Sequence, residues 1–215
     1  MEDFIIENME ILEDKKLYRE KLKIERLSFD IGDNIGILDR DNIYSEEFFK
    51  IMMGINQYTG SLKIFNREFS KFREEILYRM GMYYDGSLDM SRKLGRVLEL
   101  SGSYYRNVSK PRIEDLISKY RFSNIRQKRL NQLDLFTIRK LGIAIANLNY
   151  PDIYIFYNIL SELNKESKDI IKEIIEYETK GKLVILNSDS LEDLTDICNK
   201  IYEFKQGDIN AIYWD

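Results

Sequence analysis

Residues 32–54 read GDNIGILDRDNIYSEEFFKIMMG and divide into three parts of different character. Asn34–Leu38 is a short, mostly apolar run, which predicts a buried strand. Ser45–Met53 has apolar residues at helical spacing, and a polar loop joins it to the strand. A strand, a loop and a helix in this order predict one βα unit of a parallel sheet.

The same order of strand and helix occurs twice more along the chain. Ile153–Tyr157 precedes the helical pattern of Lys165–Tyr177, and Leu183–Leu186 precedes that of Leu191–Ile197. Strands that are apolar throughout are typical of parallel sheets covered on both faces. We therefore predict an α/β fold with a mostly parallel core sheet.

Other parts of the chain have different patterns. Leu22–Ile31 and Ser61–Phe65 alternate apolar and polar residues, which predicts half-buried antiparallel strands with Gly60 at a turn. Lys200–Trp214 predicts two short strands around a turn. Between about residues 85 and 131 the pattern changes to helices with a basic, polar surface, which indicates a helical insertion.

The composition excludes several classes of function. The 215-residue chain has a formal net charge of −4, whereas nucleic-acid binders usually carry a basic stripe, so we expect no nucleic-acid partner. No histidine occurs, which excludes a His-based triad, general base or metal site. The one cysteine, Cys198, fits a reducing compartment. Neither a leader pattern nor an apolar stretch near the ~20 residues of a membrane span occurs, so we expect a soluble chain.

Four segments, taken in order, resemble the nucleotide-binding domain of ABC transporters. Residues 32–54 keep the spacing of the family's strand, G-x-x-G-x-G-K-[ST]-[ST] phosphate loop (Walker A) and helix. Leu133–Pro151 (LDLFTIRKLGIAIANLNYP) corresponds to the L-S-G-G-Q signature and its helix. Asp152–Asn164 (DIYIFYNILSELN) corresponds to the Walker B strand, and Lys182–Asp189 (KLVILNSD) to the strand before the switch histidine.

The resemblance extends over about Leu17 to Ile209 and implies a fold. It implies an α/β, P-loop NTPase-like ABC ATPase domain with an antiparallel β region, a mostly parallel core sheet and an inserted helical subdomain. Residues 1–215 are then a single domain, with the helical subdomain at approximately residues 85–140.

The phosphate loop keeps the family's spacing, but the residues that bind phosphate and Mg²⁺ in the family are replaced. Asp39, Asn42 and Tyr44 stand at the glycine positions, Ser45 at the lysine and Glu46 at the Mg²⁺-binding hydroxyl. Asp39 and Glu46 add negative charge where a triphosphate would lie. The lost lysine removes a charge-assisted contact worth roughly 1.5–3 kcal/mol. These changes predict that neither ATP nor Mg²⁺ binds tightly at this loop.

The remaining motifs also lack the residues with which the family binds and hydrolyses ATP. The signature has Asp134, which would repel a γ-phosphate. Tyr157 stands at the Walker B aspartate and Asn158 at the catalytic glutamate, and an amide is no general base near neutral pH. Asp189 replaces the switch histidine. Tyr18 lies where the family's adenine-stacking aromatic stands, and Asp85 where its loop glutamine stands; for Tyr18 we favour ordinary packing.

The sequence therefore predicts a catalytically inactive ABC transporter ATP-binding-like subunit, a pseudo-ATPase with no catalytic, cofactor-binding or metal-binding residue. The resemblance implies a membrane subunit as partner, together with an active ABC ATPase or a second copy, and a cytoplasmic location peripheral to the membrane. Two alternatives stay open: an ATP-binding or ATP-hydrolysing subunit with divergent motifs, and an adaptor outside transport that keeps only the fold.

Two surface interpretations accompany this prediction. Tyrosine is enriched at protein interfaces, and apolar residues make a drier surface. We therefore predict a partner interface from the following residues: Tyr83, Tyr84, Asp85, Leu135 and Phe136. Four acidic groups fall in the family's nucleotide zone, and we favour solvated surface carboxylates over a cation site for them. These are Asp39, Glu46, Asp134 and Asp189.

Overall fold

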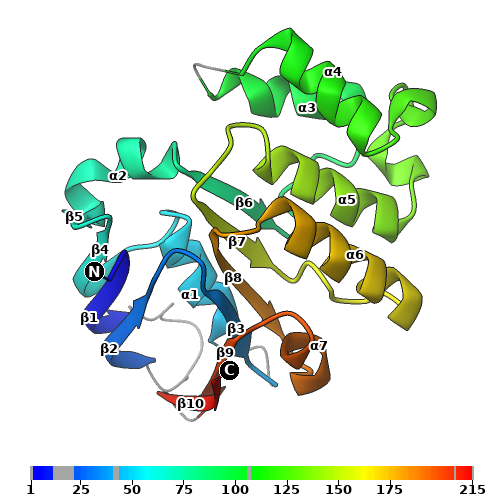
Figure 1. Ribbon diagram of the computed structural model, residues 1–215. Helices are drawn as coiled ribbons and strands as arrows, with labels where there is room; N and C mark the ends of the chain where they lie inside the picture. Colours follow the sequence, from blue (N-terminus) through cyan, green and yellow to red (C-terminus); the bar gives the residue numbers. More distant parts are fainter. Residues whose placement is uncertain (1, 12–21, 41–43, 106–107, 206, 215) are drawn as a thin grey trace.

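The structure is a computed structural model, and it describes residues 2–11, 22–40, 44–105, 108–205 and 207–214 (Figure 1). Its centre is a six-stranded sheet in the order β10-β9-β3-β8-β7-β6. The strands from β9 to β6 pair in parallel, and β10 pairs antiparallel with β9. The strands are β3 (Asn34–Leu38), β6 (Met80–Tyr84), β7 (Ile153–Tyr157), β8 (Leu183–Ser188), β9 (Lys200–Lys205) and β10 (Asp208–Trp214).

A second, antiparallel sheet has the order β2-β1-β4-β5. Its strands are β1 (Phe4–Ile11), β2 (Lys23–Phe29), β4 (Tyr58–Ile64) and β5 (Arg67–Glu68). The prediction of a turn at Gly60 is wrong, because Gly60 lies inside β4. Its φ is +85°, and a Cβ there would lie 2.2 Å from the carbonyl oxygen of Asn8, so glycine admits close contact with β1.

Helices cover both faces of the central sheet. Helix α1 lies between the two sheets, whereas α5, α6 and α7 cover the opposite face, with α3 and α4 beyond α5 (Figure 1). The helices are α1 (Ser45–Met52), α2 (Phe69–Leu77), α3 (Leu94–Ser103), α4 (Lys110–Lys119), α5 (Leu135–Ala146), α6 (Lys165–Glu178) and α7 (Leu191–Thr195), with 3₁₀ turns at Ser123–Ile125 and Leu130–Gln132.

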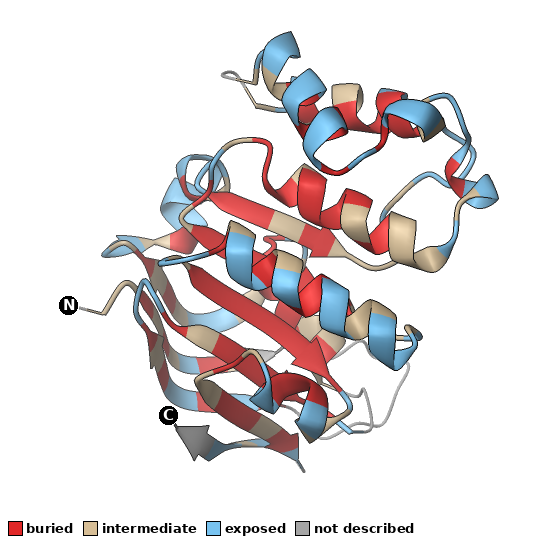
Figure 2. Cartoon of the chain, turned by 45° about the vertical axis from the view of Figure 1, so that its right-hand side comes forward, coloured by how far each residue is buried: buried red, intermediate tan, exposed pale blue. Residues whose placement is uncertain are grey.

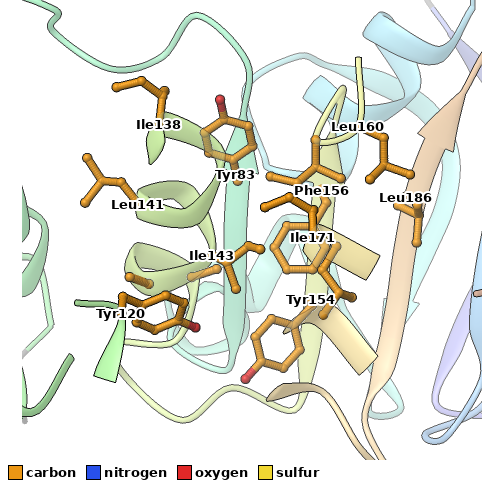
Figure 3. Packing of buried hydrophobic residues seen from close by; sticks show 14 of the residues in the cluster. Tyr83, Tyr120, Ile138, Leu141, Ile143, Tyr154, Phe156, Leu160, Ile171 and Leu186 are labelled. Carbon is orange, nitrogen blue, oxygen red and sulfur yellow. The ribbon is translucent and has the colours of Figure 1, made fainter. Parts of the chain in front are cut away.

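The inner strands β3, β7 and β8 are buried on both faces, as their apolar sequences predict (Figure 2), whereas the edge strand β10 is largely exposed. Even and odd positions of β7 face different cores. Tyr154 and Phe156 pack with Leu141 and Ile171 under α5 and α6 (Figure 3). Ile153, Ile155 and Tyr157 point to the opposite face and pack towards α1. The hydrophobic cores on the two faces of the central sheet therefore share its strands. Packing on both faces holds the strands, and so their ends, in place.

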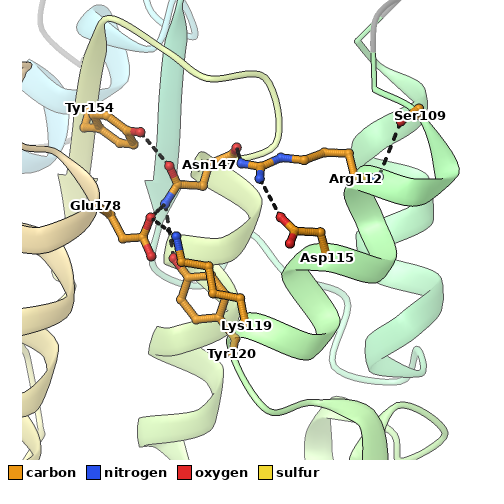
Figure 4. Close-up of polar contacts among 8 residues, drawn as sticks. All are labelled: Ser109, Arg112, Asp115, Lys119, Tyr120, Asn147, Tyr154 and Glu178. Atoms are coloured by element: carbon orange, nitrogen blue, oxygen red, sulfur yellow. Dashed lines mark hydrogen bonds and ion pairs between the residues drawn. The ribbon is translucent and has the colours of Figure 1, made fainter.

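A polar network ties α4 to the rest of this layer (Figure 4). Arg112 Nη2 donates to the carbonyl oxygen of Asn147 at 2.7 Å, and Tyr154 Oη donates to Asn147 Oδ1 at 2.6 Å. Lys119 Nζ lies 2.8 Å from a carboxylate oxygen of Glu178 on α6. Buried amide and carboxylate groups are thereby satisfied, and α4 is fixed against both α5 and α6.

The α/β class and the predicted strands of the core sheet are confirmed, and β1, β5 and β6 come in addition. Tyr83 and Tyr84 lie in β6 rather than in a loop. Between β6 and β7, the helices begin at Leu94 and end at Ala146. Within the described residues, no helix is both long and apolar enough to cross a membrane.

Candidate functional site

Three predicted site residues lie at one edge of the central sheet. In the parallel register Leu38 is opposite Ser188, and β7 ends at Tyr157 beside β8. The residues that follow these strands, Asp39, Asn158 and Asp189, therefore lie at the carboxyl edge. Ligands of open α/β sheets bind at this edge.

Asp39 turns back onto the first turn of α1. Its Oδ2 accepts the backbone N–H groups of Tyr44 at 2.8 Å and of Ser45 at 2.7 Å. The first N–H groups of a helix have no partner within the helix and are the donors that commonly bind an anion. The carboxylate of the chain itself occupies these two donors. Asp39 is 1% exposed, so its interpretation as a solvated surface carboxylate is wrong.

Aromatic rings fill the space beside α1. The ring of Tyr157, which is buried, stacks on that of Tyr84 with centroids 4.8 Å apart, and it contacts Phe49 at 5.5 Å. Tyr84 Oη donates to Glu46 Oε1 at 2.7 Å, and Lys50 Nζ lies 2.8 Å from the same carboxylate. Burial raises the pKa of the Tyr84 and Tyr157 hydroxyls, so both stay neutral.

Asn158 is held by a second asparagine. Its backbone N–H donates to Asn187 Oδ1 at 2.7 Å, and Asn187 Nδ2 donates to Asn158 Oδ1 at 2.8 Å. Asn158 has a φ of +55°, a conformation that asparagine adopts more readily than most residues. The pair of amides is hydrogen-bonded and contains no group that accepts a proton near neutral pH.

Arg139, which the sequence motifs do not single out as a site residue, joins three elements around the site. The residue is 1% exposed. Its guanidinium forms a two-pronged ion pair with Asp85, donates to Tyr83 Oη at 2.6 Å, and donates to the carbonyl oxygen of Ser161 at 3.2 Å. Burial disfavours the charged guanidinium, but the bonds and charges of Asp85 and Tyr83 outweigh this and raise its pKa.

The signature positions have structural roles. Asp134 Oδ1 accepts the backbone N–H of Thr137 at 2.7 Å and so caps α5, and this bond lowers the pKa of Asp134. Leu135 and Phe136 are half-buried, whereas Asp134 and Asp189 are exposed. Tyr18 and Asn42 lie outside the described residues.

The predicted interface needs one correction. Tyr83 is 3% exposed, because its ring packs on α5 at Gly142, so it offers no contact surface. Tyr84 and Asp85 are partly exposed. Among the described residues no three His, Cys, Asp or Glu side chains are grouped as metal ligands. Asp39, Glu46 and Asp85 instead have partners within the chain.

Comparisons with known proteins agree with this architecture. The "Uncharacterized ABC transporter ATP-binding protein MJ1023" of Methanocaldococcus jannaschii is 25% identical over 197 residues, which cover 89% of this chain and 72% of that protein. The "Lantibiotic transport ATP-binding protein SrtF" of Streptococcus pyogenes is 25% identical over 207 residues, covering 89% and 85%. No protein-family model matches the chain.

A solved structure shares the fold. The dimeric bacterial ABC transporter cassette MJ0796 superposes with a TM-score of 0.81 over 99% of both chains, at 16% identity. The chain therefore has the ABC ATPase fold, with its antiparallel sheet, mixed central sheet and covering helices. The similarity in sequence, added to the fold, supports the ABC transporter ATP-binding domain family.

Proposed function

We propose that this chain is a catalytically inactive ABC transporter subunit with a structural or regulatory role. The observation that carries the proposal is the carboxylate of Asp39 on the backbone N–H groups of Tyr44 and Ser45. A phosphate at this loop would have to displace a buried, hydrogen-bonded carboxylate, and no lysine stands at position 45 to compensate. The rings of Tyr84 and Tyr157 add a second obstruction beside α1.

The partners we propose are those of the similar proteins. One relative is described as a transport ATP-binding protein, and the solved cassette is a dimer. We propose a membrane subunit as one partner and an active ABC ATPase, or a second copy of this chain, as the other. These partners would hold the chain at the cytoplasmic side of a membrane, with neither ATP nor Mg²⁺ bound tightly.

Restoring the two motif residues of the loop is not expected to restore ATP binding or hydrolysis. In Ser45→Lys with Glu46→Thr, Asp39 still accepts the first N–H groups of α1, and Tyr157 still fills the space beside it. Binding of ATP and phosphate release would be measured for the wild type and the double variant, with an intact ABC ATPase as positive control. Tight ATP binding by the double variant, or wild-type turnover that disappears in Asn158→Ala, would contradict the proposal.

Association is expected to occur without nucleotide. In the absence of bridging ATP, a stable pair needs direct contacts of roughly 1,200 Å² or more in total. Four altered motif positions are apolar or aromatic, and of these Tyr157 is buried inside its own chain. The other three are partly exposed and remain for a contact: Tyr44, Leu135 and Phe136. Sedimentation of the chain, alone and with transporter subunits, measures this. A chain that stays monomeric in both cases, with or without ATP, would favour the adaptor alternative instead.

A further inference from the structure

A groove of about 510 Å³ lies between the end of α4, the first turns of α5 and the outer face of α6. It shares no residue with the edge of the sheet that holds Asp39 and Asn158. Volumes of this size are typical of sites for small ligands. One side of the groove carries Arg121 and Lys140, and the other carries apolar residues of α6.

Among the described residues, neither Arg121 nor Lys140 forms an ion pair with a carboxylate within 4.0 Å. Three other basic residues of the helical layer, Arg112, Lys119 and Arg126, do form such pairs. Lys140 is half-buried, and its Nζ lies 5.5 Å from the ring centroid of Phe136 and 5.8 Å from that of Phe122. Burial lowers the pKa of Lys140 and the charge of Arg121 lowers it further, against a weaker opposing effect of Asp134. An anion placed here would relieve this repulsion.

The other charges of the groove leave this end basic. Lys119 and Glu178 neutralise each other at 2.8 Å, and Glu178 also accepts a hydrogen bond from Asn147. Glu173 is the remaining acidic residue, and it lies on the exposed side of α6. Three basic and two acidic side chains therefore line the groove.

Helix α6 has more apolar surface than its core contact uses. Ile171 and Ile175 are buried against the sheet. Ile170 and Tyr177 remain 38% and 76% exposed, and with Ile174 they line the groove. Residues at these spacings lie along one side of a helix, next to the core-facing side. The groove thus combines an apolar wall with an unneutralised pair of cations.

We propose that this groove binds an amphipathic anion, a carboxylate carried on an aliphatic chain. The carboxylate lies at Arg121 and Lys140, and the chain lies along Phe136, Ile174 and Tyr177. A free fatty acid has this chemistry. The inference does not depend on the proposed loss of ATPase activity, because no residue of the nucleotide loop takes part.

Decanoate, kept below its micelle concentration, is the probe, and calorimetry measures its binding. We expect saturable binding at one site, with acetate and decyltrimethylammonium at least about tenfold weaker because each lacks one half of the interaction. Lys140→Met and Arg121→Gln should each weaken decanoate binding about tenfold. Lys71→Met, at an exposed position of α2, is the matched control and should bind as the wild type does.

Arg121 is exposed, so Arg121→Gln tests the proposal even if Lys140→Met folds poorly. Sedimentation with phosphatidylglycerol or phosphatidylcholine vesicles distinguishes a free acid from a bilayer lipid. Saturable decanoate binding without binding to either vesicle supports a site for a free acid. Vesicle binding that needs phosphatidylglycerol and Arg121, without decanoate binding, would assign the cations to a bilayer phosphate and overturn the proposal. No saturable decanoate binding, equal binding of decyltrimethylammonium, or unchanged affinity in both variants would overturn the proposal.

Discussion

Replacing Asp85 by Ala is expected to lower the free energy of unfolding by about 3 kcal/mol. The change removes the carboxylate that neutralises Arg139, whose side chain is 1% exposed, and so leaves a buried charge without a counter-ion. Asp85 itself is 37% exposed, so water enters more readily from that side, and the estimate is placed at the lower end of the range for buried pairs. Urea unfolding of the wild type and the variant measures the difference.

Two further variants distinguish a buried pair from general loss of packing. Asp85→Ala combined with Arg139→Met removes both charges, and we expect it to recover more than half of the lost stability. Glu75→Ala breaks the exposed ion pair with Arg67 and should change stability by less than about 1 kcal/mol. If the single and double variants at Asp85 were equally destabilised, the account of Arg139 as a neutralised buried charge would be wrong.

Replacing Gly142 by Ala is expected to destabilise the fold by about 3 kcal/mol. A Cβ at this position would lie 2.2 Å from Tyr83 Cδ2. The ring of Tyr83 has nowhere to move, because it is 3% exposed and its hydroxyl accepts a hydrogen bond from Arg139. Helix propensity alone predicts the opposite sign, a gain of about 1 kcal/mol for Gly→Ala within a helix.

Thermal and urea unfolding of Gly142→Ala decide between these signs. Ser118→Ala, on an exposed position of α4, is the control and should change stability by less than about 0.5 kcal/mol. Adding Tyr83→Leu to Gly142→Ala should restore part of the loss, since the smaller side chain leaves room for the Cβ. A stabilised Gly142→Ala variant would show that α5 and β6 do not pack as closely as described.

The core strands were predictable because their sequences are apolar on both faces. β3 and β7 have the predicted bounds, and β8 extends to Ser188. β1 was missed because Glu7 and Asn8 interrupt its pattern, and the register shift between Glu7 and Glu10 that accommodates them depends on β4. Such a pairing joins residues about fifty positions apart, and local periodicity carries no information about it.

The candidate site was predictable in position but not in its bonds. Motif spacing placed Asp39, Asn158 and Asp189 after strands, and parallel strands bring such residues to one edge. The hydrogen bonds from the backbone N–H groups of Tyr44 and Ser45 to the Asp39 carboxylate depend on the folded loop. An aspartate at position 39 does not by itself predict them. The role of Arg139 was not predictable, because its partner Asp85 lies 54 residues away and a basic residue at the start of a helix usually faces solvent.

The most direct test of the central claim is a calorimetric titration of the isolated wild-type chain with Mg-ATP, beside an intact ABC ATPase as positive control. The central claim is that the phosphate donors of the loop are already occupied by Asp39 and that the space beside them is filled by Tyr84 and Tyr157. We expect no measurable binding up to millimolar Mg-ATP, and no increase in thermal stability when the nucleotide is present. Saturable binding of Mg-ATP with micromolar affinity would contradict it.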